Sequence, residues 1–482
     1  MAEPGAATSG ARKLAGNAAW LTGGQLVSNV ASVVFVVIVA RAVGVREYGY
    51  FTFATAFVPL FLAFGTLGVD TAVIRELARH REQLSEVFTS GLYLRLVTGG
   101  AALALSLGLA PLFADARLAV LIVLVVGVAL FIDELTSYVA TVFKAFEQMR
   151  FHALALVVNR IGSTVLALLV YLADAGLVAI TVTYFLGSLG ALLYSVLALR
   201  RHFPPVRISA ARRATALRLL RIGAPLGVAA VLNMALFRLD TVMVQALEGA
   251  EQVGLYGVAF RFFESFLFLT WILTNLTFPR ISRQGRGDRS TRTLEVSVTV
   301  TLAAYLPLFV GSLFVSRWAV STLFGERYAE AAEAVPWLTF ALVCYGITYQ
   351  VRTASMALGA GRVIAWIAGT ALAVNLPLNL LLIPRYGFVG AATATAVVSA
   401  LELLLTVLVA RRFDLVRVPP RLAAVPLLAA LAMAGVLALM GSDGAAAAGA
   451  SAGVYLLVLM AGAALLAPAQ LRQVRTLLRK PR

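Results

Sequence analysis

Charged side chains are scarce in this chain. They make up 13% of the 482 residues, well below the roughly 25% that is usual in soluble globular domains. Hydrophobic residues make up 61%. A water-soluble fold of this size would therefore lack the polar surface it needs, and we expect an integral membrane protein without a separate soluble domain.

Residues suited to catalysis or metal binding are also rare. Cys344 is the only cysteine, which excludes disulfides and thiolate metal clusters. The three histidines, His80, His152 and His202, stand at unrelated positions, so a metal site or a nucleophile with its base is not expected. No glycine loop with a lysine is present to cradle a nucleotide phosphate. The sequence favours a protein that is not an enzyme and has no cofactor, with H+, Na+ or the membrane potential as energy source.

Apolar runs of helical length follow one another along the chain. Each is about 20 residues long, the length that crosses a bilayer core. The first run is too long for the apolar part of a signal peptide and is kept as a helix. We therefore predict an all-α membrane fold with 14 spans, approximately at 14–40, 49–69, 89–113, 119–142, 153–173, 177–199, 222–247, 254–278, 294–316, 335–358, 363–383, 388–410, 422–440 and 451–469.

The distribution of cations predicts the orientation, because short segments rich in Lys and Arg stay cytoplasmic. The even-numbered connections and both tails hold 29 of the 40 cations, and the odd-numbered connections hold 6. Both termini are therefore expected in the cytoplasm. The basic loops, and the net charge of +17, favour contact with anionic membrane lipids over nucleic-acid binding. All but three of the 40 cations are arginine, a bias that suggests a GC-rich bacterial genome and hence a bacterial cytoplasmic membrane.

Two connections have the pattern of helices lying at the membrane surface. In residues 70–89, Val73, Leu77, Leu84 and Phe88 share one helical face, and arginines point elsewhere. Residues 210–221 place leucines among arginines in a similar way. We interpret both as struts at the interface, with a gating role as the alternative.

An internal repeat relates the two halves of the chain. The segment 44–49, GVREYG, matches 249–254, GAEQVG, at an offset of 205 residues, and the stretches from Gly176 and Gly387 match at an offset of 211. Two matches in the same order predict two six-helix lobes in parallel orientation, a plan used by transporters; the alternative is generic hairpin composition. The predicted parts are a cytoplasmic tail (1–13), an N-lobe (14–199), a basic linker (200–221), a C-lobe (222–410), a linker with two further helices (411–469) and a basic tail (470–482).

Five arginines fall within the apolar spans. Each would cost ~2.5 to 3.5 kcal/mol at the membrane centre, so acidic partners or water must relieve the cost. Helical residues equally far from a turn lie at equal depth. The five are Arg95, Arg160, Arg238, Arg261 and Arg352.

Depth predicts partners around the turn at 250–251. Asp240 and Arg261 lie at one depth, and Arg238 and Glu264 at another. Such pairs either cement two helices or line a wet cavity that receives a charged substrate. Four ionisable groups in one hairpin exceed what packing requires, which favours the cavity.

A third set surrounds the turn near residue 147. Arg160 shares its depth with Asp133 and Glu134, and here the cavity and the structural ion pair remain equal alternatives. All three are candidate site residues.

Other polar residues in the spans give weaker signals. Arg95 and Arg352 lie near cytoplasmic ends, so we expect their side chains to extend to the interface. Glu402 has no obvious partner and is a candidate proton or cation site. Asn375 lies beside Pro377, which is the expected hinge or break in its helix.

The sequence resembles the oligosaccharide flippases of polysaccharide biosynthesis, within the multidrug/oligosaccharidyl-lipid/polysaccharide exporter superfamily. Three strings carry the resemblance, and it extends over about residues 10–412. They are GVREYGYFTFATAF at 44–57, GTLGVDTAVIRELAR at 65–79 and FRLDTVMVQALEGAEQVGLYGVAFRF at 237–262.

The resemblance implies two six-helix lobes around a V-shaped cationic cavity that opens alternately to each face and moves a lipid-linked glycan to the outer leaflet. It also implies pathway partners, namely a polysaccharide polymerase and glycosyltransferases. The related peptidoglycan-precursor flippases carry arginines in their first helix. Here that helix has only Asn17, Gln25 and Asn29, which favours the general polysaccharide branch.

A polyprenyl-diphosphate sugar fits these features. Its hydrocarbon tail can stay in lipid while its anionic head crosses a polar groove. Arginine suits a diphosphate because its planar fork donates paired hydrogen bonds and keeps its charge. We expect Arg238, Arg261 and Arg160 to contact the diphosphate, with Asp240 and Glu264 positioning them or responding to a coupling cation.

Two other functions remain open. A multidrug antiporter of the same superfamily would share the fold but prefer carboxylates without arginine in its cavity. A membrane polysaccharide polymerase or glycosyltransferase would be an enzyme and would need a sizeable outer loop, whereas the longest polar connection here is at about 200–221, on the predicted cytoplasmic side.

Overall fold

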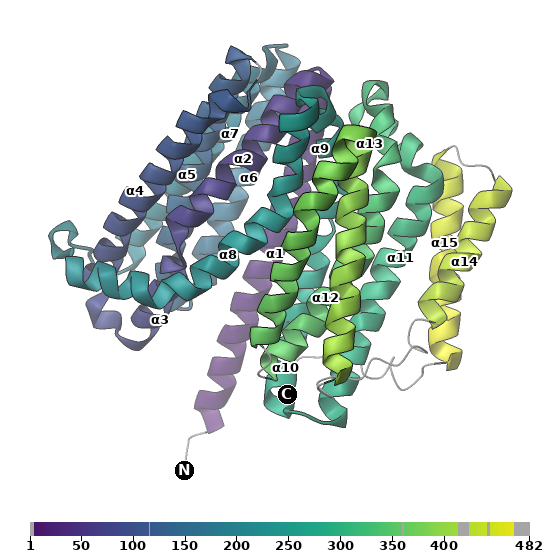
Figure 1. Ribbon diagram of the computed structural model, residues 1–482. Coiled ribbons are helices and arrows are strands. Elements are labelled where there is room, and N and C mark those ends of the chain that lie inside the picture. Colours follow the sequence, from purple (N-terminus) through teal and green to yellow (C-terminus); the bar gives the residue numbers. More distant parts are fainter. Residues whose placement is uncertain (1–3, 115, 359–360, 413–423, 441–443, 467–482) are drawn as a thin grey trace. The chain divides into compact units, whose positions relative to one another are not determined.

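The computed structural model describes residues 4–114, 116–358, 361–412, 424–440 and 444–466. The regular elements in these ranges are all helices (Figure 1). The chain divides into two compact units, the first ending at Gly254 and the second beginning at Leu255. The predicted lobe boundaries, which fall elsewhere, stay predictions.

Among its described residues, the first unit contains eight α-helices and three short 3-10 helices, and its last residues, 250–254, begin a ninth α-helix. The α-helices are α1 (Pro4–Ala42), α2 (Val45–Thr66), α3 (Val69–Arg79), α4 (Leu84–Leu109), α5 (Arg117–Ala145), α6 (Met149–Leu172), α7 (Gly176–His202) and α8 (Arg213–Glu248). The 3-10 helices are η1 (Arg81–Gln83), η2 (Ala110–Leu112) and η3 (Ile208–Ala210).

The second unit begins within α9 (Ala250–Glu264). Its other elements are α10 (Leu267–Gln284), α11 (Asp288–Phe324), η4 (Glu326–Glu333), α12 (Val335–Ala357), α13 (Gly361–Arg412), α14 (Ala424–Met440) and α15 (Ala445–Leu466).

Many of these helices are long and apolar enough to cross a membrane. In the part of the chain that the structure describes there are 11, or up to 12 if η4 and α12, which meet at a bend of 51°, form one span. In the described ranges the predicted apolar runs are largely helical, but the run at 254–278 covers parts of both α9 and α10, and the runs at 363–383 and 388–410 both lie in α13. The number of 14 crossings and the cytoplasmic termini stay predictions.

The predicted surface helix at 70–89 is divided among α3, η1 and the beginning of α4. Left-handed backbone at Leu67 and Gly68 separates α2 from α3, and α3 ends before His80. The residues from Leu84 onward already belong to α4. The prediction of one continuous helix is therefore wrong. Hydrophobic periodicity does not detect a helix break when the apolar residues on both sides of the break keep the same spacing. Residues 213–221 likewise form the first turns of α8 rather than a separate helix.

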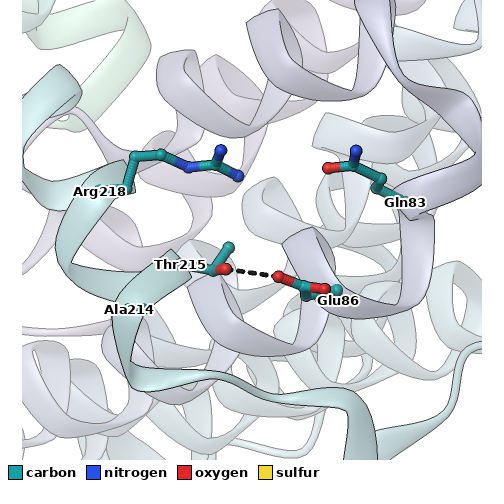
Figure 2. A pocket seen from close by; sticks show the side chains of 5 residues that line it. All are labelled: Gln83, Glu86, Ala214, Thr215 and Arg218. Carbon is teal, nitrogen blue, oxygen red and sulfur yellow. Dashed lines mark hydrogen bonds between the residues drawn. The ribbon is translucent and has the colours of Figure 1, made fainter.

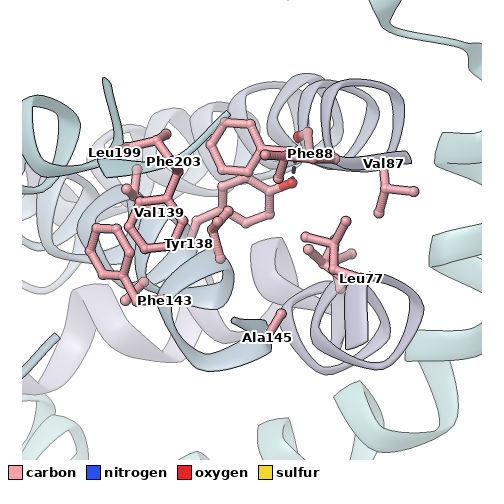
Figure 3. Close-up of a cluster of buried hydrophobic side chains, with 14 of the residues drawn as sticks. Leu77, Val87, Phe88, Tyr138, Val139, Phe143, Ala145, Leu199 and Phe203 are labelled. Carbon is pink, nitrogen blue, oxygen red and sulfur yellow. Dashed lines mark hydrogen bonds between the residues drawn. The ribbon is translucent and has the colours of Figure 1, made fainter. Parts of the chain in front are cut away.

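The four apolar residues predicted to share one face nevertheless lie together, two on α3 and two on α4. Val73, Leu77, Leu84 and Phe88 are all buried in a single hydrophobic cluster with residues of α5 and α7 (Figure 3). In the same cluster the Tyr138 hydroxyl donates a hydrogen bond of 2.6 Å to the carbonyl oxygen of Phe88. The cluster fixes α3 against α4 and α5, and so positions the polar residues at the start of α3.

The helix α13 contains a break at Gly387, with φ 57° and ψ −138°. Pro377, predicted as the hinge, lies inside the helix, as do Asn375 and Asn379. Both asparagines are buried, and the Asn379 side chain donates to the carbonyl oxygen of Asn375 at 3.1 Å. The break at Gly387 falls in the predicted connection between the runs 363–383 and 388–410, and the helix continues through Pro377.

Candidate functional site

Arg95, on α4, is buried beside two half-exposed carboxylates, and we call these three residues the Arg95 cluster. Its Nη2 atom lies 2.7 Å from Glu134 Oε2 on α5, and its Nε atom lies 3.3 Å from Asp70 Oδ1 on α3. The Arg95 side chain is only 3% exposed. The prediction that Arg95 extends to the interface is wrong, because two carboxylates compensate its charge inside the protein.

Asp70 was not among the predicted site residues. Burial raises the pKa of its carboxyl, and the neighbouring Arg95 guanidinium offsets part of that rise. Its place at the first turn of α3 ties this short helix to α4. Asp70 therefore belongs to the packing of the first unit.

A second polar cluster surrounds Asp133, the residue before Glu134 on α5. Its Oδ1 atom accepts a hydrogen bond of 2.6 Å from Asn159 Nδ2 on α6, and its Oδ2 atom accepts one of 3.2 Å from the Tyr184 hydroxyl on α7. Arg160 acts electrostatically on Asp133, and its guanidinium carbon lies 5.5 Å from the centre of the Tyr184 ring. These four residues, Asp133, Asn159, Arg160 and Tyr184, form the Asp133 cluster.

The structure thus divides the predicted set of Arg160, Asp133 and Glu134 between two clusters. Successive residues of an α-helix project about 100° apart, so adjacent carboxylates on α5 meet different neighbours. Glu134 pairs with Arg95, whereas Asp133 is near Arg160. Of the two arginines, Arg160 is the half-buried one and so is the more accessible to a ligand.

Two of the ion pairs in the second unit involve candidate site residues. Arg261 Nη1 is 3.2 Å from Glu264 Oε2, one turn further along α9. Arg352 Nη1 is 2.9 Å from Glu402 Oε1, joining α12 to α13. Glu402 therefore has a partner, which corrects the prediction that it has none, and Arg352 is turned to this buried carboxylate rather than to the interface.

The remaining candidates are on α8 in the first unit. Arg238 is half-buried, and Asp240 is buried, with 2% of its surface exposed. The predicted pairs of Asp240 with Arg261 and of Arg238 with Glu264 would join residues of the two units, and they stay predictions. What the structure adds is that Arg261 and Glu264 also face each other along α9.

A polar network around Gln350 was missed from the sequence. The Gln350 Oε1 atom accepts a hydrogen bond of 2.8 Å from Ser297 on α11, and its Nε2 atom donates to the carbonyl oxygen of Thr270 on α10 at 3.3 Å. An amide in an apolar run is a weak signal because many such residues only satisfy neighbouring helices. Here it links three helices of the second unit.

A pocket of about 410 Å³ lies where α4 and the beginning of α8 meet (Figure 2). The Thr215 hydroxyl donates a hydrogen bond of 2.6 Å to Glu86 across it. Arg218, which also lines the pocket, pairs with Glu76 of α3 at 3.0 Å, and Arg212 pairs with Glu86 at 3.5 Å. These interactions fasten the end of the basic linker to α3 and α4.

Within the described ranges, no group of three or more His, Cys, Asp or Glu residues is placed to hold a metal ion.

Long apolar helices carrying compensated charges indicate a multi-pass membrane protein. The chain belongs to the polysaccharide biosynthesis protein family, whose model matches residues 14–284. This segment contains Arg95, Arg160, Arg238 and Arg261.

Two relatives from Haloferax volcanii match over a smaller part of the chain. The probable low-salt glycan biosynthesis flippase Agl15 is 24% identical over 170 residues, which cover 35% of this chain and 36% of the relative. The probable flippase AglR is 30% identical over 177 residues, covering 35% and 37%. The matched part is thus little more than a third of the length of either relative.

Solved structures with the same fold cover much more of the chain. The lipid II flippase MurJ in an inward closed conformation matches with a TM-score of 0.76 at 16% identity, over 94% of this chain and 99% of that one. An inward-facing multidrug resistance MATE family transporter of the MOP superfamily matches with a TM-score of 0.63 at 16% identity, over 82% and 95%. The chain therefore has the fold of this transporter superfamily.

Proposed function

We propose that this protein is a flippase that moves a polyprenyl-diphosphate-linked oligosaccharide from the cytoplasmic to the outer leaflet by alternating access. The observation that carries the proposal is the family match over residues 14–284. Curated relatives described as probable flippases, and a fold shared with a lipid flippase, support the same class. The protein would act as a transporter, not an enzyme, coupled to H+, Na+ or the membrane potential.

Arg160, Arg238 and Arg261 are the proposed diphosphate contacts. Each is half-buried, whereas Arg95 is fully enclosed by its carboxylates. A partly exposed guanidinium can exchange its protein partner for phosphate oxygens at small cost. The charge-assisted hydrogen bonds that it loses to a carboxylate are replaced by charge-assisted hydrogen bonds to phosphate. Asp133 and Glu264 would hold Arg160 and Arg261 in place when no substrate is bound.

The proposal is tested by reconstitution of the purified protein in vesicles with a fluorescent polyprenyl-diphosphate oligosaccharide. We expect labelled lipid to move between leaflets only in vesicles that contain the protein. Vesicles with the same lipid lacking its sugar and diphosphate serve as a specificity control. Failure to move the lipid-linked oligosaccharide would contradict the proposal.

A cation-coupled multidrug antiporter is the second candidate, favoured by the fold shared with MATE transporters. The charges argue mildly against it, because carboxylates of the apolar helices such as Glu134, Glu264 and Glu402 each lie beside an arginine. A cationic dye added to the same vesicles distinguishes the two. Movement of the dye without movement of the lipid would favour the antiporter.

The pathway suggests further partners. Anionic lipids would contact the basic linker, and a polymerase and glycosyltransferases would act before and after the flipping step. A polymerase or glycosyltransferase activity of the chain itself would lengthen the glycan, and mass analysis of the recovered lipid tests this directly.

A further inference from the structure

The turn between α1 and α2 contacts the turn between α8 and α9, both within the first unit. A Cβ atom placed on Gly49 would overlap the carbonyl oxygen of Ala250, and a Cβ atom placed on Gly254 would overlap the carbonyl oxygen of Val45. Gly49 is at the start of α2 and Gly254 at the start of α9. Each glycine thus lies in close contact with the backbone of the opposite turn.

The contact is reciprocal, and the internal repeat explains why. At the offset of 205 residues, Gly49 corresponds to Gly254 and Val45 corresponds to Ala250. Each half of the repeat therefore supplies the same glycine and the same carbonyl group. A contact in which equivalent residues exchange roles has approximate two-fold symmetry.

At either glycine the atom nearest to an added Cβ atom is a backbone carbonyl oxygen of the opposite turn, which cannot move aside as a flexible side chain can. Close packing of this kind cannot absorb an extra methyl group without separating the two turns. Gly44, in the same α1–α2 turn, differs. A Cβ atom there meets nothing within 4 Å, and its φ of −71° suits any residue.

We propose that this reciprocal contact is a latch at the outer face, which Gly49 and Gly254 close in one state of the transport cycle and which opens to release the glycan. The proposal rests on the proposed flippase function and on the predicted orientation, which puts both turns outside. The closest atoms on each side of the latch are uncharged backbone atoms. Gly49 and Gly254 are thus positioning residues and not substrate contacts.

The test measures opening of the latch without any substrate. In a Cys344→Ala background, Ala250→Cys places a thiol at the contact, where Ala250 is 2% exposed. A membrane-impermeant maleimide is applied to right-side-out and to inverted vesicles. We expect Gly49→Ala and Gly254→Ala to accelerate labelling at least about tenfold in right-side-out vesicles only, because overpacking shifts the population toward the open form.

Two controls separate opening from unfolding. Gly44→Ala should leave the labelling rate unchanged. Ala119→Cys, which is fully buried at the start of α5, should stay unlabelled in every glycine variant. The latch would be overturned if labelling of Ala250→Cys were accelerated in neither glycine variant, or equally in Gly44→Ala. Labelling at Ala119→Cys as well, or acceleration only in inverted vesicles, would also overturn it.

The labelling result is independent of the proposed substrate. If the parent protein fails to move the lipid-linked oligosaccharide while the glycine variants label as expected, the proposed function fails and the latch stands. If lipid transport occurs and labelling does not respond, the latch fails alone.

Discussion

The Arg95 guanidinium holds two carboxylates from two other helices, so its removal leaves charges uncompensated. Breaking a buried pair by removing one partner typically costs ~3 to 5 kcal/mol. Glu134 and Asp70 are 37% and 27% exposed, and solvent screening reduces that cost. We expect Arg95→Met to lower the free energy of unfolding by about 2 kcal/mol or more, which thermal unfolding of the detergent-solubilised protein would measure.

The matched control is an exposed ion pair in the second unit. Arg317 and Glu326 lie 3.6 Å apart, with 76% and 74% of their side chains exposed. Such a pair contributes little, so Arg317→Met should leave the midpoint of thermal unfolding nearly unchanged. An equal loss of stability in both variants would contradict a structural role specific to the Arg95 cluster.

Removal of a proposed diphosphate contact should affect transport and not folding. Hydrogen bonds to charged groups contribute about 1.5 to 3 kcal/mol, so Arg238→Ala or Arg261→Ala should slow lipid flipping at least about tenfold. Yield and elution volume should match the parent. Arg385→Ala, at an exposed position, is the control and should retain the parent rate. Normal transport in both test variants would remove the site assignment.

Depth along the helices was enough to place some of these residues together, but not others. The midpoint between Arg95 and Glu134 falls in the turn between α4 and α5, so the same arithmetic could have found this pair. Arg352 and Glu402 share no single turn, since the first part of α13 intervenes. Depth also says nothing about rotation around the helix axis, which is what separates Asp133 from Glu134.

At the scale of elements, the apolar runs located the helices well because bilayer thickness sets their length. The breaks were harder to predict. The stop after Arg79 and the left-handed residues at Leu67 and Gly68 depend on a few backbone angles, whereas periodicity averages over many residues. Gly387 lies in the predicted connection between the runs 363–383 and 388–410, whereas Pro377, the predicted hinge, lies within the helix.

The break at Gly387 leads to a prediction for α13. Its backbone, with φ 57° and ψ −138°, is costly for a residue with a Cβ atom. Gly387→Ala should therefore lower the free energy of unfolding by about 1 to 3 kcal/mol. Gly369→Ala is the control in the same helix, because a Cβ atom there meets nothing within 4 Å. Thermal unfolding of the two variants would test this, and an equal response would argue against strain at Gly387.

At the scale of the whole molecule, the repeat and the contact-defined units divide the chain differently. The repeat begins a second lobe at α8, whereas α8 packs within the first unit, where Gly223 and Gly227 approach the backbone of Leu67 and Gly68 closely. Sequence similarity records how the halves arose. Packing records which helices contact each other in this conformation, and an alternating-access protein can exchange such contacts during its cycle.

The direction of transport depends on the orientation of the whole chain, and the cation distribution makes that orientation testable. In a Cys344→Ala background, Ser209→Cys lies in the basic linker and Ala175→Cys in the turn between α6 and α7, and both positions are exposed. A membrane-impermeant maleimide should label Ala175→Cys in intact cells and Ser209→Cys only after permeabilisation, because segments rich in arginine stay cytoplasmic. The reverse pattern would invert the predicted topology. The α1–α2 turn would then be cytoplasmic, and export through an outer latch at Gly49 would be impossible.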